Sequence, residues 1–238
     1  AGTDVAKSVL LALAGEVVPD AVNVSGGAVG EEVAPWLDIV RKQGVLLGAL
    51  SDGLPTSLSV DVRGELASED VDILKLSALR GLFSAVIEDA VTFVNAPSLA
   101  EERGVTAEVT TAPESPNHRS VVDVRAVYGD GTVLNVAGTL TGPQHVEKIV
   151  NINGRNFDLR AEGKNLLVTY EDRPGSLGRI GTALGDAGVD IAAAALSQDA
   201  EGTGATILLR VDRDVPSDVR DSIAAAVGAS TLELVDLS

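Results

Sequence analysis

One short stretch of the chain carries side chains that could recognise an amino acid. Tyr170 and Asp172 come just before Arg173-Pro174-Gly175, and Asp190 follows a short apolar segment. Carboxylates and a phenol can surround an ammonium group, while the N–H groups that open a helix near Pro174 can bind a carboxylate. Glycine would let a ligand approach the backbone closely. In the purely structural alternative, Asp172 only caps a helix and Asp190 only starts a strand.

A second set of candidate residues is basic. Between His118 and Lys164 there are six Lys or Arg residues against five acidic ones, whereas the whole chain has a formal charge of −17. Guanidinium and ammonium groups bind phosphate or carboxylate, so this span is a candidate anion site. The turn Asn153-Gly-Arg-Asn156 adds backbone amides suited to an anion. The alternative is a solvated surface whose charges have local partners, such as Arg160 with Glu162.

The sequence predicts no catalytic residue and no metal site. The chain has no cysteine, which excludes thiolate ligands, disulfides and a cysteine nucleophile, and its two histidines make a histidine-rich zinc site unexpected. Gly175-Ser-Leu-Gly178 follows a predicted strand but lacks the glycine spacing of a dinucleotide fingerprint. We therefore expect no cofactor to bind this chain.

The elements that must position Asp172 follow the order β-α-β-β-α-β. The pattern predicts a strand at 166–170, a helix capped by Asp172 that starts near Pro174 and ends at a left-handed Gly188, and a strand at 189–196. A strand at 206–211, a helix at 216–227 and a strand at 231–235 follow. This order is typical of a ferredoxin-like fold, in which strand 189–196 forms a sheet edge that a second copy could pair with.

Residues 25–162 read as a separate α+β domain. Helices are predicted over 31–50, 68–82 and 91–103, the last interrupted near Pro97, and strands over 58–62, 105–110, 119–128, 132–140 and 145–152. Consecutive strands joined by short turns predict an antiparallel sheet with helices on one face. Residues 1–24 predict an apolar helix over 3–14 and an extended segment.

Composition limits the partners. Apolar residues make up 45% of the chain and aromatic ones only 3%, so its cores must be aliphatic. The charge of −17 argues against binding nucleic acid or an anionic membrane. No run of 18 apolar residues and no signal pattern is present, so we expect a cytoplasmic protein.

The turn Asp172-Arg-Pro-Gly175, its apolar helix and Gly188-Val-Asp190-Ile resemble the ACT domain, a family of small-molecule sensors, mostly of amino acids. Together with Gly2-Thr-Asp-Val-Ala and Val18-Pro-Asp-Ala-Val-Asn, the chain resembles the C-terminal regulatory half of long-type D-3-phosphoglycerate dehydrogenases of mycobacteria and other actinobacteria. The resemblance implies a remnant of the catalytic body at 1–24, an intervening allosteric substrate-binding domain at 25–162, and an ACT domain at 163–238.

The resemblance also implies ligands. It implies feedback inhibition by L-serine of an NAD-dependent oxidoreductase that opens serine biosynthesis, with NAD bound by the parent enzyme. The implied effector residues are Tyr170, Asp172, Arg173, Pro174, Gly175 and Asp190. Phosphate or a phosphorylated hydroxy acid is implied at the anion-binding residues His118, Arg119, Lys148, Arg155, Arg160 and Arg210.

One position departs from the family pattern, which usually has asparagine where this chain has Asp190. A carboxylate cannot donate a hydrogen bond to the carboxylate of a ligand and repels it at short range. An alternative to the enzyme fragment is a non-enzymatic amino-acid-sensing or dimerisation module. Under either interpretation we expect a homodimer or a higher oligomer, formed through the edge strand of the ACT domain and the intervening domain.

Overall fold

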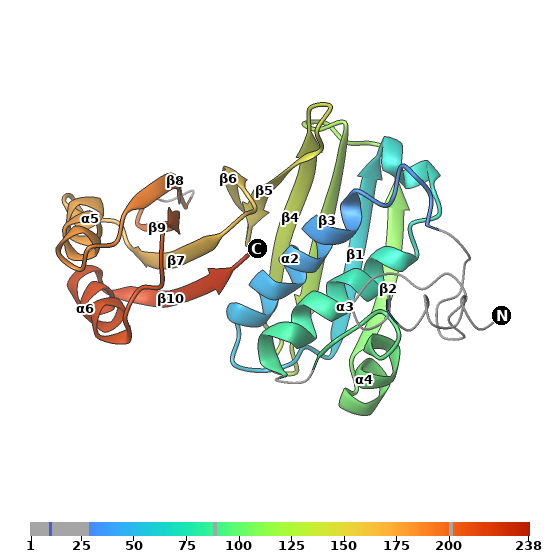
Figure 1. Ribbon diagram of the computed structural model, residues 1–238, viewed down its shortest axis with the longest axis horizontal. Coiled ribbons are helices and arrows are strands. Elements are labelled where there is room, and N and C mark those ends of the chain that lie inside the picture. Colours follow the sequence, from blue (N-terminus) through green and yellow to red (C-terminus); the bar gives the residue numbers. More distant parts are fainter. Residues whose placement is uncertain (1–9, 11–28, 88–89, 200–201) are drawn as a thin grey trace. The chain divides into compact units, whose positions relative to one another are not determined.

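The protein is an α+β chain that divides into two compact units, which confirms the predicted fold class. A computed structural model describes residue 10 and residues 29–87, 90–199 and 202–238 (Figure 1). The first unit runs to Val146 and the second from Glu147 to Ser238. Apart from Leu10, the helix predicted at 3–14 and the extended segment after it lie outside the described residues.

Within the first unit the strand order is β2-β1-β3-β4. These strands are β1 (Ser57–Gly64), β2 (Thr106–Ala112), β3 (Ser120–Val127) and β4 (Val133–Thr141). β3 pairs antiparallel with β1 and with β4, as predicted. β2 instead runs parallel to β1, because the chain between them crosses over through helices and does not return by a hairpin.

Two helices cover one face of this sheet (Figure 1). α2 (Trp36–Ala49) packs on β3 and β4, and α3 (Ile73–Val86) on β1 and β2. Alternate strand residues are fully buried on the covered face, among them Leu58, Val60, Val62, Val122 and Val124. The opposite face carries polar side chains such as Asp61 and Asp123, which gives the strands their alternating pattern.

The two helices approach each other closely. A Cβ atom added to Gly44 would lie 2.2 Å from the carbonyl oxygen of Ala78, and one added to Gly81 would lie 1.8 Å from that of Arg41. Only glycine fits at these two positions, since the obstructing atoms belong to the backbone.

Shorter helices complete the first unit, and their ends differ from the prediction. η1 (Glu65–Ser68) follows β1, and α4 (Ala96–Arg103) precedes β2. Pro97 lies in the first turn of α4, so it starts a helix where the sequence analysis expected an interruption. α2 begins at Trp36 because residues 31–35 form turns.

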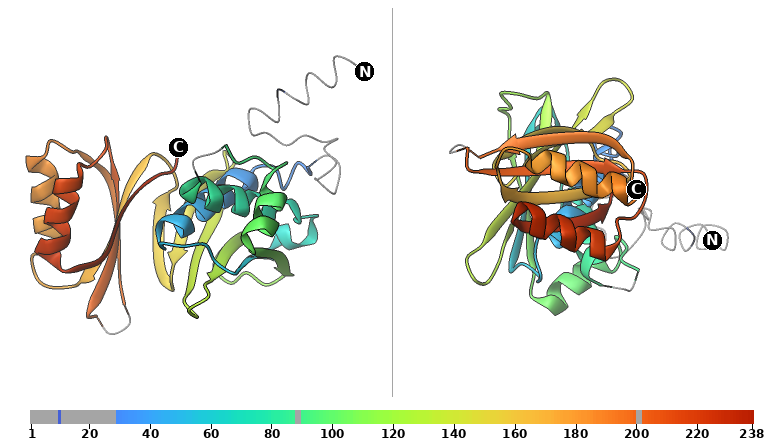
Figure 2. Two further views of the ribbon diagram at one scale, coloured as in Figure 1. Left: turned by 90° about the horizontal axis from the view of Figure 1, so that it is seen from below. Right: turned by 90° about the vertical axis from the view of Figure 1, so that its left-hand side faces the viewer.

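The second unit contains the predicted βαββαβ order. Its sheet has strand order β10-β7-β9-β8, and both helices lie on one face of it (Figure 2). The elements are β7 (Lys164–Glu171), α5 (Ser176–Asp186), β8 (Ile191–Gln198), β9 (Gly204–Val211), α6 (Ser217–Val227) and β10 (Ala229–Asp236). Except for Tyr170, the core between helices and sheet is aliphatic, as composition predicted, and includes Leu166, Val168, Ile207, Ile180, Leu184 and Ile223.

A hairpin of β5 (Val146–Ile152) and β6 (Arg155–Arg160) precedes this sheet. The sequence analysis missed β6, whose buried residues are only Phe157 and Leu159, because charged residues alternate with them. β6 lies close to β8 within the same unit. β8 is the last strand of its sheet, and no other strand hydrogen-bonds to its outer side in the described part of the chain.

The start of α5 corrects one prediction. The residue at the N-cap is Gly175, in the left-handed region with φ of +88°, and no side chain caps the helix. Asp172 is therefore not the cap: its carboxylate accepts a hydrogen bond from the side chain of Gln198, and its N–H donates to the carbonyl oxygen of Thr203 at 3.0 Å. The helix ends as predicted at a left-handed glycine: Ala187 is the C-cap, and Gly188 follows it with φ of +70°.

Candidate functional site

The predicted effector turn lies at the carboxyl end of β7. Asp172 is half-buried there, whereas Arg173, Pro174 and Gly175 are exposed. The guanidinium of Arg173 forms an ion pair with Glu171, so it is partly neutralised before any ligand arrives. No side chain caps α5, and although the N–H of Ser176 donates to the carbonyl oxygen of Arg173 at 3.0 Å, the N–H groups that follow it could bind a ligand carboxylate.

Two buried hydroxyl groups next to this turn have no hydrogen-bond partner within the described chain. They belong to Tyr170, which is 3% exposed, and Ser176, which is 2% exposed. Burial raises the pKa of the Tyr170 phenol, and the negative charge of Asp172 raises it further, so the phenol stays protonated. A buried hydroxyl without a partner is unfavourable, and a polar ligand could supply the missing bond. The sequence analysis did not single out Ser176 or Gln198.

Asp190 lies at the other end of the sheet. β7 and β8 are both antiparallel to β9, so they run parallel to each other, and the register sets Tyr170 level with Gln198. Asp190 immediately precedes β8, and its N–H donates to a carboxylate oxygen of Asp212 at 2.9 Å. Eight residues of strand span roughly 26 Å. One copy of the chain therefore does not bring Asp190 to the turn that carries Asp172.

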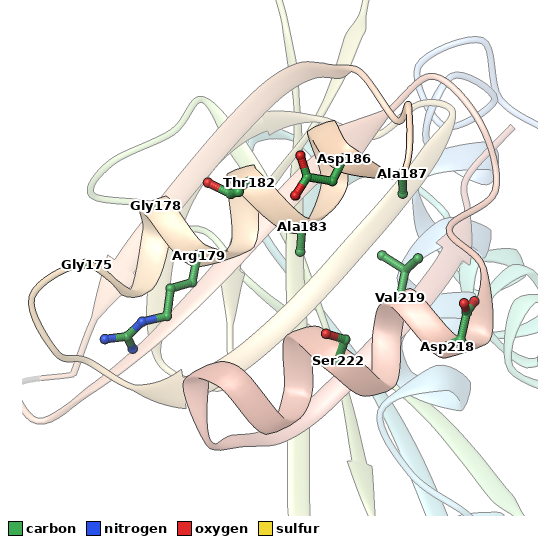
Figure 3. Close-up of a pocket in the computed structure, with 10 residues that line it drawn as sticks. All are labelled: Gly175, Gly178, Arg179, Thr182, Ala183, Asp186, Ala187, Asp218, Val219 and Ser222. Carbon is green, nitrogen blue, oxygen red and sulfur yellow. The ribbon is translucent and has the colours of Figure 1, made fainter.

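A hollow near this turn lies between α5 and α6 and measures about 720 Å³. Figure 3 shows Arg179 and Ala183 of α5 pointing towards α6, whose Val219 and Ser222 line the other wall. Gly175 is the one predicted effector residue that lines it. The hollow is therefore not where Tyr170, Asp172 and Asp190 meet.

Some of the predicted anion-binding residues come together on the β5–β6 hairpin. Lys148 and Arg160 are direct cross-strand partners, so their side chains share one face. The ammonium of Lys148 pairs with the carboxylate of Asp158 at 2.6 Å. An anion at this face would have to share Lys148 with that carboxylate.

Two further basic residues lie in the same unit. Arg210, on β9, pairs with Glu162, whose N–H donates to the carbonyl oxygen of Arg160. Glu162 is therefore the partner of Arg210, whereas the structural alternative paired it with Arg160. Arg155 is half-buried near the turn that joins β8 to β9, and its Nε has no partner within the described residues.

His118 and Arg119 belong to the first unit. They line a cavity there with Glu65, which pairs with Arg119 at 2.6 Å. In the described part of the chain, no group of three or more His, Asp or Glu side chains could hold a metal ion. Over the same residues, no helix is long and apolar enough to cross a membrane.

Comparison with known proteins agrees with this architecture. Residues 32–153 match the model of the D-3-phosphoglycerate dehydrogenase intervening domain, and residues 164–228 match that of the ACT domain. The fold thus defines the chain as an ACT-domain protein in which an intervening domain precedes the ACT domain. The chain belongs to the D-3-phosphoglycerate dehydrogenase family.

The relatives that this chain matches are longer proteins. Over 238 residues the chain is 74% identical to D-3-phosphoglycerate dehydrogenase of Mycobacterium leprae and 75% identical to that of Mycobacterium tuberculosis H37Rv. The enzyme of the same name from Methanocaldococcus jannaschii is 26% identical over 241 residues. Each match covers all of this chain but only 45% of the relative's length.

Proposed function

We propose that this chain is the regulatory region of an NAD-dependent D-3-phosphoglycerate dehydrogenase and that it binds L-serine, the end product of the pathway, between two copies of its ACT domain. Family membership and the absence of a dinucleotide fingerprint support a regulatory role. The hydride transfer then takes place in a part of the enzyme outside these residues.

The observation that carries the two-copy site is the position of Asp190. Asp172 and Asp190 are at opposite ends of the parallel strands β7 and β8, yet both are adjacent to the edge strand β8. An antiparallel pairing of two β8 edges about a two-fold axis brings Asp190 of the second copy to Gln198 of the first. In that register the two-fold axis passes through Ala194, because residue 194 is midway between residues 190 and 198.

Side-chain sizes along β8 favour this register. Ala192, Ala193, Ala194 and Ala195 form the middle of the strand, so two copies can approach closely there. Leu196 is 44% exposed and lies opposite Ala192 of the second copy in this register, a large residue against a small one. Pairing would cover this apolar edge and satisfy its open backbone groups.

The ligand chemistry of the site suits an amino acid. The carboxylate of Asp172 matches an ammonium group, and the uncapped start of α5 matches a carboxylate. The partnerless hydroxyls of Tyr170 and Ser176 are available to a short polar side chain such as that of serine.

The test combines calorimetric titration of L-serine with sedimentation velocity. We expect saturable heat at millimolar serine or below and a dimer that serine stabilises, because binding only to the dimer shifts the equilibrium towards it. Ala194→Arg, at the proposed axis, should give a monomer that no longer binds serine. The matched control is Ala225→Arg on the exposed face of α6, which should leave both properties unchanged.

Two results would count against the proposal. A monomeric Ala194→Arg variant that binds serine with unchanged affinity would remove the two-copy site. A dimeric wild type that shows no heat with serine would favour the dimerisation module.

We further propose that phosphate or a phosphorylated hydroxy acid binds at Lys148, Arg160 and Arg210, with Arg155 as a contributing residue. The cross-strand alignment of Lys148 with Arg160 supports this site. Arg160→Ala should weaken phosphate binding by about tenfold, as expected for loss of a charge-assisted hydrogen bond. Arg103→Ala on α4 is the control, and equal affinities in the two variants would argue for a solvated surface.

A further inference from the structure

The first unit contains a second cavity, lined by His118 and Arg119 but by none of the residues to which the proposed function above assigns serine or phosphate. It measures about 870 Å³ and lies at the end of the sheet where β1 and β4 end and β3 begins. Its walls include the 3₁₀ helix η1, the segment before α2 and the turn after β4. We call it the Trp36 cavity, after the chain's single tryptophan, which lines it.

The backbone around the Trp36 cavity is held rigidly. Gly64 has φ of +90°, and a Cβ atom there would lie 2.2 Å from the carbonyl oxygen of Arg119. The hydroxyl of Ser120, which is 7% exposed, accepts the N–H of Leu66 at 3.0 Å, and the hydroxyl of Thr139 donates to the Ser120 carbonyl at 2.7 Å. These contacts join η1, β3 and β4, so the cavity is preformed and a ligand need not order it.

Its charged groups are of both signs and most of them are unpaired. Glu32, Glu69, His118 and His145 make no hydrogen bond or ion pair through their side chains within the described chain. Arg119 pairs with Glu65 through Nε, which leaves the outer edge of its guanidinium for another acceptor. The cavity thus has donors on the segment that enters β3, and free carboxylates on Glu69, directly after η1, and on Glu32, before α2.

The backbone conformation of His145 also indicates a role beyond stabilising the fold. It has φ of +50°, in the left-handed region that glycine or asparagine adopts more easily. A turn whose only role was to connect β4 to β5 would be more relaxed with glycine at this position. His145 instead lines a polar cavity.

We propose that the Trp36 cavity binds a zwitterionic α-amino acid with an apolar side chain. A simple anion would meet three carboxylates, and a simple cation would meet Arg119, so a dipolar ligand satisfies both sets of groups. Its carboxylate binds at Arg119 and His118, and its ammonium binds at Glu69 and Glu32. The apolar surfaces of Trp36, Leu66 and Pro143 take the side chain.

The single tryptophan makes the experiment direct. L-leucine is titrated into the full chain while the emission of Trp36 is followed, alongside 4-methylpentanoate, which lacks the ammonium, and isopentylamine, which lacks the carboxylate. We expect saturable change with L-leucine in the millimolar range and none with either analogue. Glu69→Gln and His118→Gln should each weaken binding by about tenfold, as for loss of a charged partner.

Controls separate this site from the ACT domain and from folding. Asp172→Ala should abolish serine binding and leave the leucine titration unchanged, so the two proposals fail independently. Glu102→Gln on α4 should change neither. His145→Gly should weaken leucine binding without lowering the melting temperature, because the turn relaxes.

The inference is overturned by any of three results. They are an absence of emission change or heat with L-leucine, an equal response to either analogue, and unchanged affinity in both Glu69→Gln and His118→Gln.

Discussion

Asp190 is the residue whose charge bears most directly on serine binding. In the two-copy arrangement it approaches the turn that carries Asp172 of the other copy, so two carboxylates surround one ammonium, and one of them also faces the ligand carboxylate. Like charges at short range oppose binding. We therefore predict that Asp190→Asn tightens L-serine binding by about tenfold, measured by calorimetry. It should also strengthen the dimer.

The control for this prediction is Asp221→Asn, which removes the same charge from the exposed face of α6. Its serine affinity should equal that of the wild type. Weaker binding by Asp190→Asn would mean that Asp190 faces the ammonium, and the arrangement of the ligand would have to be reversed.

Asp123 is a residue whose ionised form is unfavourable in the folded state. It lies on the open face of the first sheet, directly opposite Asp61 on β1. Burial raises its pKa and the charge of Asp61 raises it further, against the hydrogen bond from Asn135 at 3.1 Å. A carboxyl whose pKa is raised on folding binds its proton more tightly in the folded state, so stability falls as pH rises through that raised pKa.

We predict that Asp123→Asn stabilises the protein at pH 7 by about 1 kcal/mol, because it removes a buried charge and a like-charge cross-strand pair. Urea unfolding at pH 7 and at pH 5, above the sequence pI of about 4.4, measures the difference. The gain in stability should shrink at the lower pH, where the wild-type carboxyl approaches its neutral form.

Asp130→Asn should instead lower the stability, since the N–H of Thr132 lowers the pKa of that carboxyl. A gain for Asp123→Asn that does not depend on pH would point to packing instead of charge.

At the scale of elements, glycines in two helices have opposite roles. Gly81 in α3 has the backbone of α2 within 1.8 Å of a hypothetical Cβ, whereas Gly181 in α5 has nothing within 4 Å. We predict that Gly81→Ala destabilises the first unit by about 3 kcal/mol, because the helices must move apart. Gly181→Ala should stabilise the second unit by about 0.5–1 kcal/mol through helix propensity. Urea unfolding followed by circular dichroism measures both, and equal effects of the two substitutions would contradict the close packing of α2 on α3.

The same scale explains what the sequence could and could not predict. The ACT elements were predictable because apolar periodicity, Gly188 and the hydrophobic strands all favour one order. The cap at Asp172 was mispredicted because a carboxylate before proline and glycine has the same local pattern whether it binds the helix or Gln198 on β8. The parallel pairing of β2 depends on a long crossover, which local patterns do not reveal. Asp172 and Asp190 flank the same helix, α5, in the sequence, which gives no sign that they lie far apart. Their separation follows only from the strand register, which places them at opposite ends of the sheet.

At the scale of the whole molecule, net charge connects the two proposed binding events. The chain carries −17, so association of two copies brings together strongly acidic bodies. The middle of the proposed dimer contact is made of backbone groups, alanine and Leu196, which carry no charge, and Asp190 lies only at its ends. Phosphate binding, in contrast, depends on attraction to Lys148, Arg160 and Arg210. Salt should therefore act on the two equilibria in opposite directions.

We predict that raising sodium chloride from about 20 mM to about 500 mM tightens the dimer and weakens phosphate binding, because the screening length falls from roughly 20 Å to roughly 4 Å. Repulsion between the two acidic copies is long-ranged and is screened, while the backbone pairing at β8 is short-ranged and remains. At the hairpin, screening and chloride competition both reduce attraction for phosphate. Sedimentation velocity measures the first effect and calorimetry the second. Sodium sulfate at equal ionic strength should weaken phosphate binding more than chloride does, since sulfate resembles the ligand. A dimer that dissociates with salt would show that ion pairs hold the copies together, and the β8 edge would then not be the contact.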